Sequence, residues 1–115
     1  TVVWNVTNGG NAFLNLTGTG RILSITNPVA GHTYTIRIVQ GSANRTISTW
    51  PTGTRWQGGT PPTLSTTAGA IDVVSLYYDG SNYYGTFGLS FSFIDVPTIK
   101  RNIVPLYEET FNVAA

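Results

Sequence analysis

Apolar and polar residues alternate along most of the chain with the period of two that is typical of β-strands. In the clearest run, residues 33–40, four side chains share one face: Tyr34, Ile36, Ile38 and Gln40. Further runs of strand length are separated by turn residues and cover residues 2–6, 12–17, 21–26, 45–50, 71–78 and 83–93. Before position 95, no helical spacing of apolar residues persists for ten residues. The pattern therefore predicts strands and no helix.

The spacing of these runs predicts the fold class. Strand signals recur about every 8–12 residues, which is typical of all-β sandwiches and barrels, and no repeat of 20–50 residues is recognisable. Residues 51–62, rich in Pro and Gly, predict a long loop, and Asp79-Gly80-Ser81-Asn82 predicts a hairpin turn. We expect an all-β fold, an antiparallel β-sandwich of jelly-roll-like type, over residues 1–94.

The chain changes character after Ile94. Residues 95–115 contain two prolines, a basic pair and an acidic pair, and they keep eight large apolar side chains without a regular period. Because exposed apolar side chains favour association, we expect this segment to pack on something. It is either an extra edge strand of the same sandwich or an extended C-terminal arm that contacts a neighbouring subunit. The candidate assembly residues of the arm are Ile99, Ile103, Leu106, Tyr107 and Phe111.

Composition argues against several classes of partner. The 115 residues carry a net charge of +1, and only 10% of them are charged. The chain thus lacks the Lys and Arg that nucleic-acid phosphates or an anionic membrane require. No apolar run approaches the roughly 20 residues of a transmembrane helix, so we expect no membrane insertion. The sequence has no Cys, which excludes disulfides and thiolate metal ligands.

Catalytic chemistry finds little support in the sequence. His32 is the single histidine, it lies in a turn, and no serine occupies a nucleophile-elbow motif. A glycosidase requires two facing carboxylates, and each acidic residue has a simpler structural interpretation. The acidic residues are Asp72, Asp79, Asp95, Glu108 and Glu109. We expect no enzyme activity, no catalytic residue, no metal site and no cofactor.

Paired tyrosines form the most prominent candidate site. Two adjacent tyrosines precede the predicted hairpin turn and two follow it, so strand alternation places one of each pair inside and one outside. Outward tyrosines suit a subunit interface and a platform for sugar rings equally well. With one tryptophan from the preceding loop, the candidate ligand or interface aromatics are Trp56, Tyr77, Tyr78, Tyr83 and Tyr84.

Two tryptophans bracket the start of the Pro- and Gly-rich stretch. Trp50 and Trp56 are separated by five residues that include Pro51 and Gly53. A tryptophan on a loop can stack on a sugar ring, and it can equally close the end of a sandwich. We favour the packing interpretation for both residues.

The ordered set of motifs resembles the small β-sandwich domain of bacteriophage tail fibres and capsid surface proteins. An Asn27-Pro28-x-x-Gly31 turn leads into a strand that ends in Val39-Gln40, and further segments follow in the order of that family. The matching segments are residues 27–40, 49–51, 55–62, 72–78 and 79–85, within a resemblance that covers about residues 12–91. The resemblance implies a non-enzymatic, usually trimeric virion module in which Trp56, Gly58-Gly59 and Asp79-Gly80 serve the fold.

The resemblance and the arm together lead to a functional hypothesis. A fibre tip needs an N-terminal shaft, which this sequence does not show, whereas a capsid decoration protein needs a compact head and a segment that holds neighbouring capsomers. We therefore expect a decoration or cement protein, a homotrimer on the exterior of the virion with the major capsid protein as its partner. The alternatives are a tail-fibre or spike tip that binds a host receptor glycan, and a free-standing carbohydrate-binding module.

Overall fold

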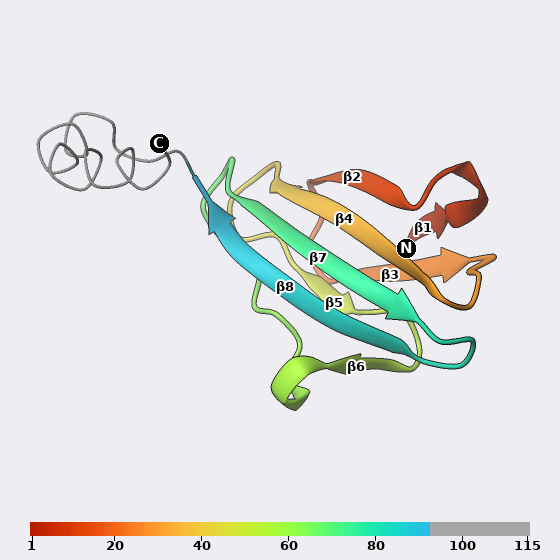
Figure 1. Ribbon diagram of the computed structural model, residues 1–115. Helices are drawn as coiled ribbons and strands as arrows, with labels where there is room; N and C mark the ends of the chain where they lie inside the picture. Colours follow the sequence, from red (N-terminus) through yellow and green to blue (C-terminus); the bar gives the residue numbers. More distant parts are fainter. Residues whose placement is uncertain (93–115) are drawn as a thin grey trace, which may run out of the picture.

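The computed structural model of the chain describes residues 1–92, which form eight strands and two short 3-10 turns (Figure 1). The strands are β1 (Val2–Asn5), β2 (Asn11–Leu16), β3 (Arg21–Thr26), β4 (His32–Gln40), β5 (Ile47–Thr49), β6 (Thr54–Trp56), β7 (Ile71–Tyr78) and β8 (Tyr83–Phe91). The turns are η1 (Val6–Asn8) and η2 (Gln57–Gly59). The predicted all-β class is confirmed. The predicted arm at 95–115, with its five candidate assembly residues, lies outside the described residues.

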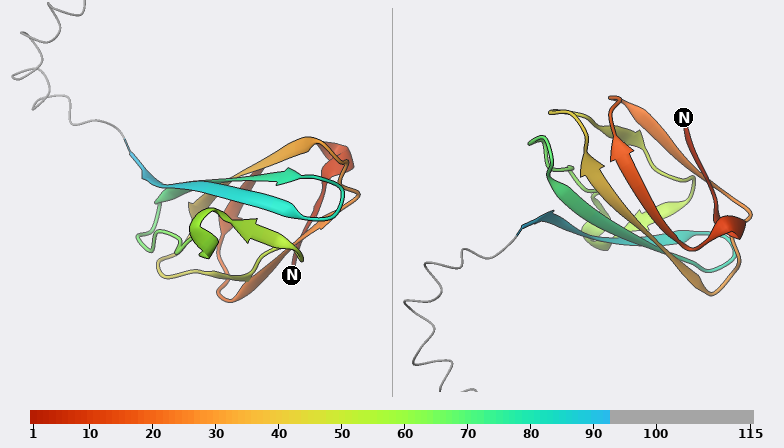
Figure 2. Two further views of the ribbon diagram at one scale, coloured as in Figure 1. Left: turned by 60° about the horizontal axis from the view of Figure 1, so that its bottom comes forward. Right: turned by 90° about the horizontal axis from the view of Figure 1, so that it is seen from above.

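The strands form two sheets that lie one over the other (Figure 2). The smaller sheet has the order β1-β3-β5, and the larger has the order β2-β4-β7-β8-β6. From β1 to β5, each strand lies in the other sheet from the strand before it. The chain therefore winds between the two layers in its first half, and in its second half it adds β6 and the β7–β8 hairpin to the larger sheet.

The expected antiparallel pairing is wrong for four of the six strand pairs. β1 and β3, β3 and β5, β2 and β4, and β6 and β8 are parallel, whereas β7 is antiparallel to β4 and to β8. For the three pairs among β1 to β5 the reason is the winding, because a chain that crosses to the facing layer and returns runs again in its original direction. β6 and β8 are parallel for another reason, since β7, which lies between them in the chain, belongs to the same sheet and runs in the opposite direction. Val2 thus lies opposite Leu23, and Asn11 lies opposite Thr35. This coil has no matching sequence repeat.

The expected loop over residues 51–62 is also wrong in part, because it contains β6 and η2. β6 pairs in parallel with the start of β8, where Arg55 lies opposite Tyr84 and Trp56 lies opposite Gly85. A strand of three residues is too short to show a period of two, and its position depends on its neighbour β8. It leaves no periodic signal in its own sequence.

The core lies between the sheets and is built from alternate residues of each strand. In β4 the predicted inward set, Tyr34, Ile36, Ile38 and Gln40, is buried, and the residues between them are more exposed. β7 contributes Val74 and Leu76, which are fully buried. Further core residues come from both layers and are Leu16, Leu23, Ile47 and Tyr83. Burial of such side chains is the main favourable term in folding.

One end of the core holds two buried polar residues, Gln40 and Asp72, each 2% exposed. The Gln40 amide nitrogen donates to the carbonyl oxygens of Arg45 and Ser65 at 3.1 and 2.6 Å, and its oxygen accepts from the Arg45 amide at 2.8 Å. The Asp72 carboxylate accepts from the amide and hydroxyl of Ser65 at 2.8 and 2.7 Å and from the Ser90 amide at 2.9 Å. These bonds fasten the loop before β7 and the end of β8 to the core.

Asp72→Asn is expected to destabilise the fold by about 1–3 kcal/mol, although the side chain keeps its size. Both carboxylate oxygens accept a hydrogen bond, so an amide nitrogen in either orientation faces a donor. Urea unfolding of the full chain measures the effect. Asp79→Asn is the matched control, because it makes the same exchange at an exposed carboxylate whose other oxygen still accepts from the turn amides, so it should cost less than Asp72→Asn. Equal stability of Asp72→Asn and the wild-type chain would contradict the role given to Asp72.

Candidate functional site

The β7–β8 hairpin brings the four candidate tyrosines together. Tyr77 lies opposite Tyr84, and Tyr78 lies opposite Tyr83. Tyr83 is 5% exposed and Tyr78 packs against the core, whereas Tyr77 and Tyr84 are 43% and 44% exposed. The hairpin thus presents one tyrosine pair on each side of the larger sheet, as strand alternation predicts.

The turn between these strands is held by Asp79. Its carboxylate accepts from the backbone amides of Ser81 and Asn82 at 2.8 and 2.7 Å and from the Tyr84 hydroxyl at 2.9 Å. The amide of Asn82, then that of Ser81, and then the Tyr84 hydroxyl lower the pKa of Asp79. The same bond to Asp79 raises the pKa of Tyr84. Asp79 therefore positions Tyr84 and caps the turn.

The outward side of the larger sheet carries five prominent side chains, which we call the outer face: Phe13, Arg37, Tyr77, Tyr84 and Phe91. The rings of Tyr77 and Tyr84 are 6.4 Å apart. Farther along the sheet, Phe13 and Phe91 are 60% and 54% exposed. The Arg37 guanidinium lies 4.5 Å from the centre of the Phe13 ring, in a cation–π contact. The outer face is thus aromatic.

Phe91 belongs to the outer face because β8 contains an irregularity. Val73 lies opposite Gly88 and Ile71 lies opposite Phe91, so β8 has one more residue than β7 over this interval. Ser90 within it has a φ of 56°, and its amide donates to Asp72. A Cβ on Gly88 would lie 2.6 Å from the Phe91 ring, so the ring packs over the bare backbone of Gly88 and would have to shift for a larger residue.

Trp56 does not join the tyrosines. Its ring packs edge-on against Trp50 at 5.1 Å and against Phe87 at 5.9 Å. It also covers Gly85, where any Cβ would overlap the indole. Both tryptophans are half-buried against the core, which agrees with the packing interpretation. Trp50 also lines the pocket described next, a role that the sequence did not indicate.

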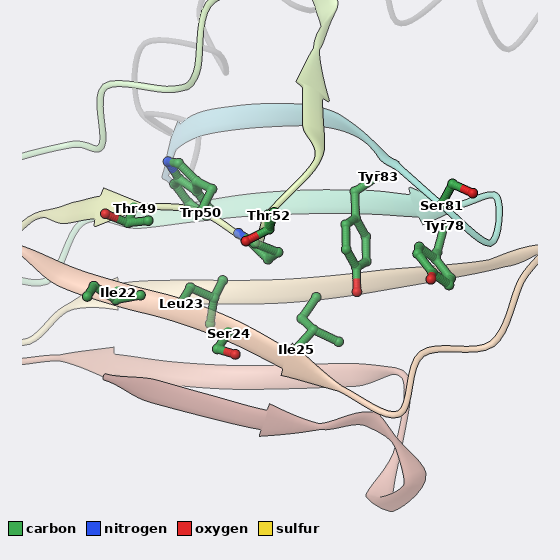
Figure 3. A pocket seen from close by; sticks show the side chains of 11 residues that line it. Ile22, Leu23, Ser24, Ile25, Thr49, Trp50, Thr52, Tyr78, Ser81 and Tyr83 are labelled. Atoms are coloured by element: carbon green, nitrogen blue, oxygen red, sulfur yellow. The ribbon is translucent and has the colours of Figure 1, made fainter.

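A pocket of about 310 Å³ opens on the inner side of the hairpin, between the two sheets (Figure 3). Its lining comes from residues 22–25 of β3, from residues 49–52, which begin at the last residue of β5, and from Tyr78, Ser81 and Tyr83 of the hairpin. The Tyr83 ring points from β8 toward Ile25 on β3 (Figure 3). Only Tyr78 and Tyr83 of this set were sequence candidates, because the period of a strand does not tell which strands face it across the core.

Within residues 1–92, the residues considered for catalysis lie at the surface or serve the fold. His32 is exposed at the start of β4. Asp72 and Asp79 both use their carboxylates for structural hydrogen bonds. In this part of the chain, His and acidic side chains form no group of three that could hold a metal ion. Asp95, Glu108 and Glu109 lie outside the described residues.

No helix within residues 1–92 has both the length and the apolar character needed to cross a membrane. Comparisons with protein-family models, with curated proteins and with solved structures gave no match. The outer face and the pocket described above are the candidate sites of residues 1–92.

The Tyr84 hydroxyl is expected to lose its proton above its usual pKa of 10.0, because the anion would form beside the Asp79 carboxylate. Asp79→Asn should return the pKa of Tyr84 toward 10.0. A titration followed by NMR of labelled tyrosine rings measures this, and Tyr84→Phe identifies the signal. An unchanged titration in Asp79→Asn would contradict the contact.

The same contact makes stability depend on pH at both extremes. Folding lowers the pKa of Asp79 below its usual 3.8, so the stabilisation is present above that pH and is lost as the pH falls through the lowered value. Folding raises the pKa of Tyr84, so its contribution is present below pH 10.0 and is lost as the pH rises through the raised value. Urea unfolding at several pH values should show both losses reduced in Asp79→Asn.

Proposed function

We propose that this chain is a non-enzymatic bacteriophage virion protein, a decoration or cement protein that forms a homotrimer on the exterior of the capsid. Its described part is, in this proposal, a β-sandwich head of the jelly-roll-like kind. Residues 95–115 are the arm that contacts a neighbouring copy or the major capsid protein. The ordered motifs that resemble phage virion domains support this proposal from the sequence.

The outer face is the observation that carries the proposal. Four aromatic rings lie on one side of one sheet, and Phe13 and Phe91 keep more than half of their surface exposed. Large aromatic side chains and Arg are enriched at protein interfaces, and contiguous exposed apolar patches mark interaction sites. With only 10% charged residues in the chain, association through apolar contact fits this surface better than association through charge.

The place where the described chain ends supports a role for the arm. β8 ends at Phe91, which lies on the outer face opposite Ile71. The residues that follow, 93–115, include the candidate assembly residues Ile99, Ile103, Leu106, Tyr107 and Phe111. A segment of this length spans up to about 75 Å when extended, which is enough to reach another copy. We propose that it covers the outer face of a neighbour.

A tail-fibre or spike tip that binds a host glycan is the second candidate. The pocket beside Tyr78 and Tyr83 favours it, since an uncharged aromatic pocket suits a sugar. A free-standing carbohydrate-binding module would use the same pocket as a monomer. The oligomeric state separates these proposals.

The full chain is expected to sediment as a trimer, and substitutions that place polarity at the contacts should shift it toward the monomer. Phe13→Ser with Phe91→Ser tests the outer face, and Ile103→Asp with Phe111→Asp tests the arm. Val3→Ser is the matched control, because Val3 is an equally exposed apolar residue on the other sheet. Sedimentation equilibrium measures the mass, and circular dichroism confirms that each variant folds.

A monomeric full chain at every concentration tested would overturn the assembly proposal. The virion assignment has its own test, which is peptide mass spectrometry of purified phage particles. The chain should be present there in a fixed ratio to the major capsid protein. Its absence from purified particles would overturn the assignment whatever its mass in solution.

A further inference from the structure

The pocket between β3 and the β7–β8 hairpin points to an activity beyond assembly. We propose that it binds a small, neutral, hydroxyl-rich ring, such as one sugar unit, with Tyr83 as the central hydrogen-bonding residue. The ring would lie between Ile25 of β3 and the aromatic side chains of Trp50 and Tyr78 (Figure 3). The inference rests on this pocket and not on the virion proposal.

The Tyr83 hydroxyl is a hydrogen-bonding group of the pocket lining that has no partner within residues 1–92. Tyr83 is 5% exposed, and its hydroxyl makes no hydrogen bond within residues 1–92. The neighbouring buried or hairpin tyrosines are satisfied: the Tyr78 hydroxyl donates to the Gly80 carbonyl at 2.9 Å, and the Tyr34 hydroxyl accepts from the Val29 amide at 2.7 Å. The Tyr83 oxygen is not among the buried unpartnered atoms of residues 1–92, so it is accessible from the pocket. A ligand hydroxyl can therefore bond to it in place of water.

The aromatic lining suits one face of a sugar ring. Tyr78 and Tyr83 are tilted against each other with ring centres 4.7 Å apart, and Trp50 stands across the pocket from them. The C–H groups of a sugar ring pack on aromatic surface, while its hydroxyls point to the edges. Thr52 and Ser81 line the same pocket and offer hydroxyls that both donate and accept. This combination matches a neutral polyol.

The absence of charged side chains among the described lining residues favours a neutral ligand. No Asp, Glu, Lys, Arg or His is among the described residues that line it. Burial, followed by the neighbouring Tyr78 and Tyr34, raises the pKa of Tyr83, so its hydroxyl stays neutral and serves as both donor and acceptor. A phosphate or an ammonium group would enter without a partner for its charge. At about 310 Å³ the pocket lies at the lower end of ligand-site volumes, which favours one ring over a long chain.

The test is an NMR titration of the full, labelled chain with methyl glycosides of glucose, galactose, mannose and N-acetylglucosamine. At least one should bind saturably with a dissociation constant on the order of 1 mM, as expected for a small polar ligand. The shifted signals should include Trp50, Tyr78 and Tyr83. Tyr83→Phe, which removes only the hydroxyl, should weaken binding by roughly two- to tenfold.

Tyr84→Phe is the matched control, because it removes a hydroxyl from the same hairpin on the opposite side of the sheet. It should leave the dissociation constant unchanged. Thr52→Val changes an exposed residue of the pocket lining and should also weaken binding. It tests the pocket independently if Tyr83→Phe disturbs the fold. The proposal is overturned if no glycoside shifts the pocket signals, or if the shifts fall on Tyr77 and Tyr84. It is overturned as well if both pocket variants bind like the wild-type chain.

Discussion

The carboxylate of Asp72 fastens the loop before β7 and the end of β8 to the core. It lies on the inward side of β7 at one end of the core, and it accepts hydrogen bonds from the loop at Ser65 and from β8 at Ser90. The bond to Ser90 accompanies the extra residue in β8. That residue turns Phe91 to the outer face, so a buried polar contact lies directly beside the irregularity that places an exposed aromatic side chain.

This irregularity also shows where the sequence stops being informative. In β4, strict alternation predicts the buried set from Tyr34 to Gln40, because both neighbours of that strand continue the regular register. In β8, alternation alone would place Phe87 and Phe91 on one face. The extra residue at Ser90 separates them, and nothing in the run of apolar residues marks it. Its cause is a partner in β7, distant along the chain.

The sequence also did not indicate whether neighbouring strands are parallel or antiparallel. Parallel and antiparallel strands have the same period of two, and the runs in the first half of the chain are short enough for either. What makes β1, β3 and β5 parallel is that β2 and β4 lie in the other layer. Seven of the eight strands follow from turn residues and apolar runs, whereas β6 and the order of the strands do not. The order depends on which layer each strand joins. The pocket was missed for this reason, since β3 faces the hairpin only across the core.

The same hairpin supplies both proposed surfaces, and strand alternation keeps them apart. Tyr77 and Tyr84 point to the outer face, while Tyr78 and Tyr83 point inward to the pocket. A neighbouring copy that covers the outer face therefore leaves the mouth of the pocket on the other side of the sheet. Assembly would then set several pockets on one particle, and weak binding at each would add through multivalency. A millimolar site, too weak to matter in a monomer, becomes useful on a repeating surface.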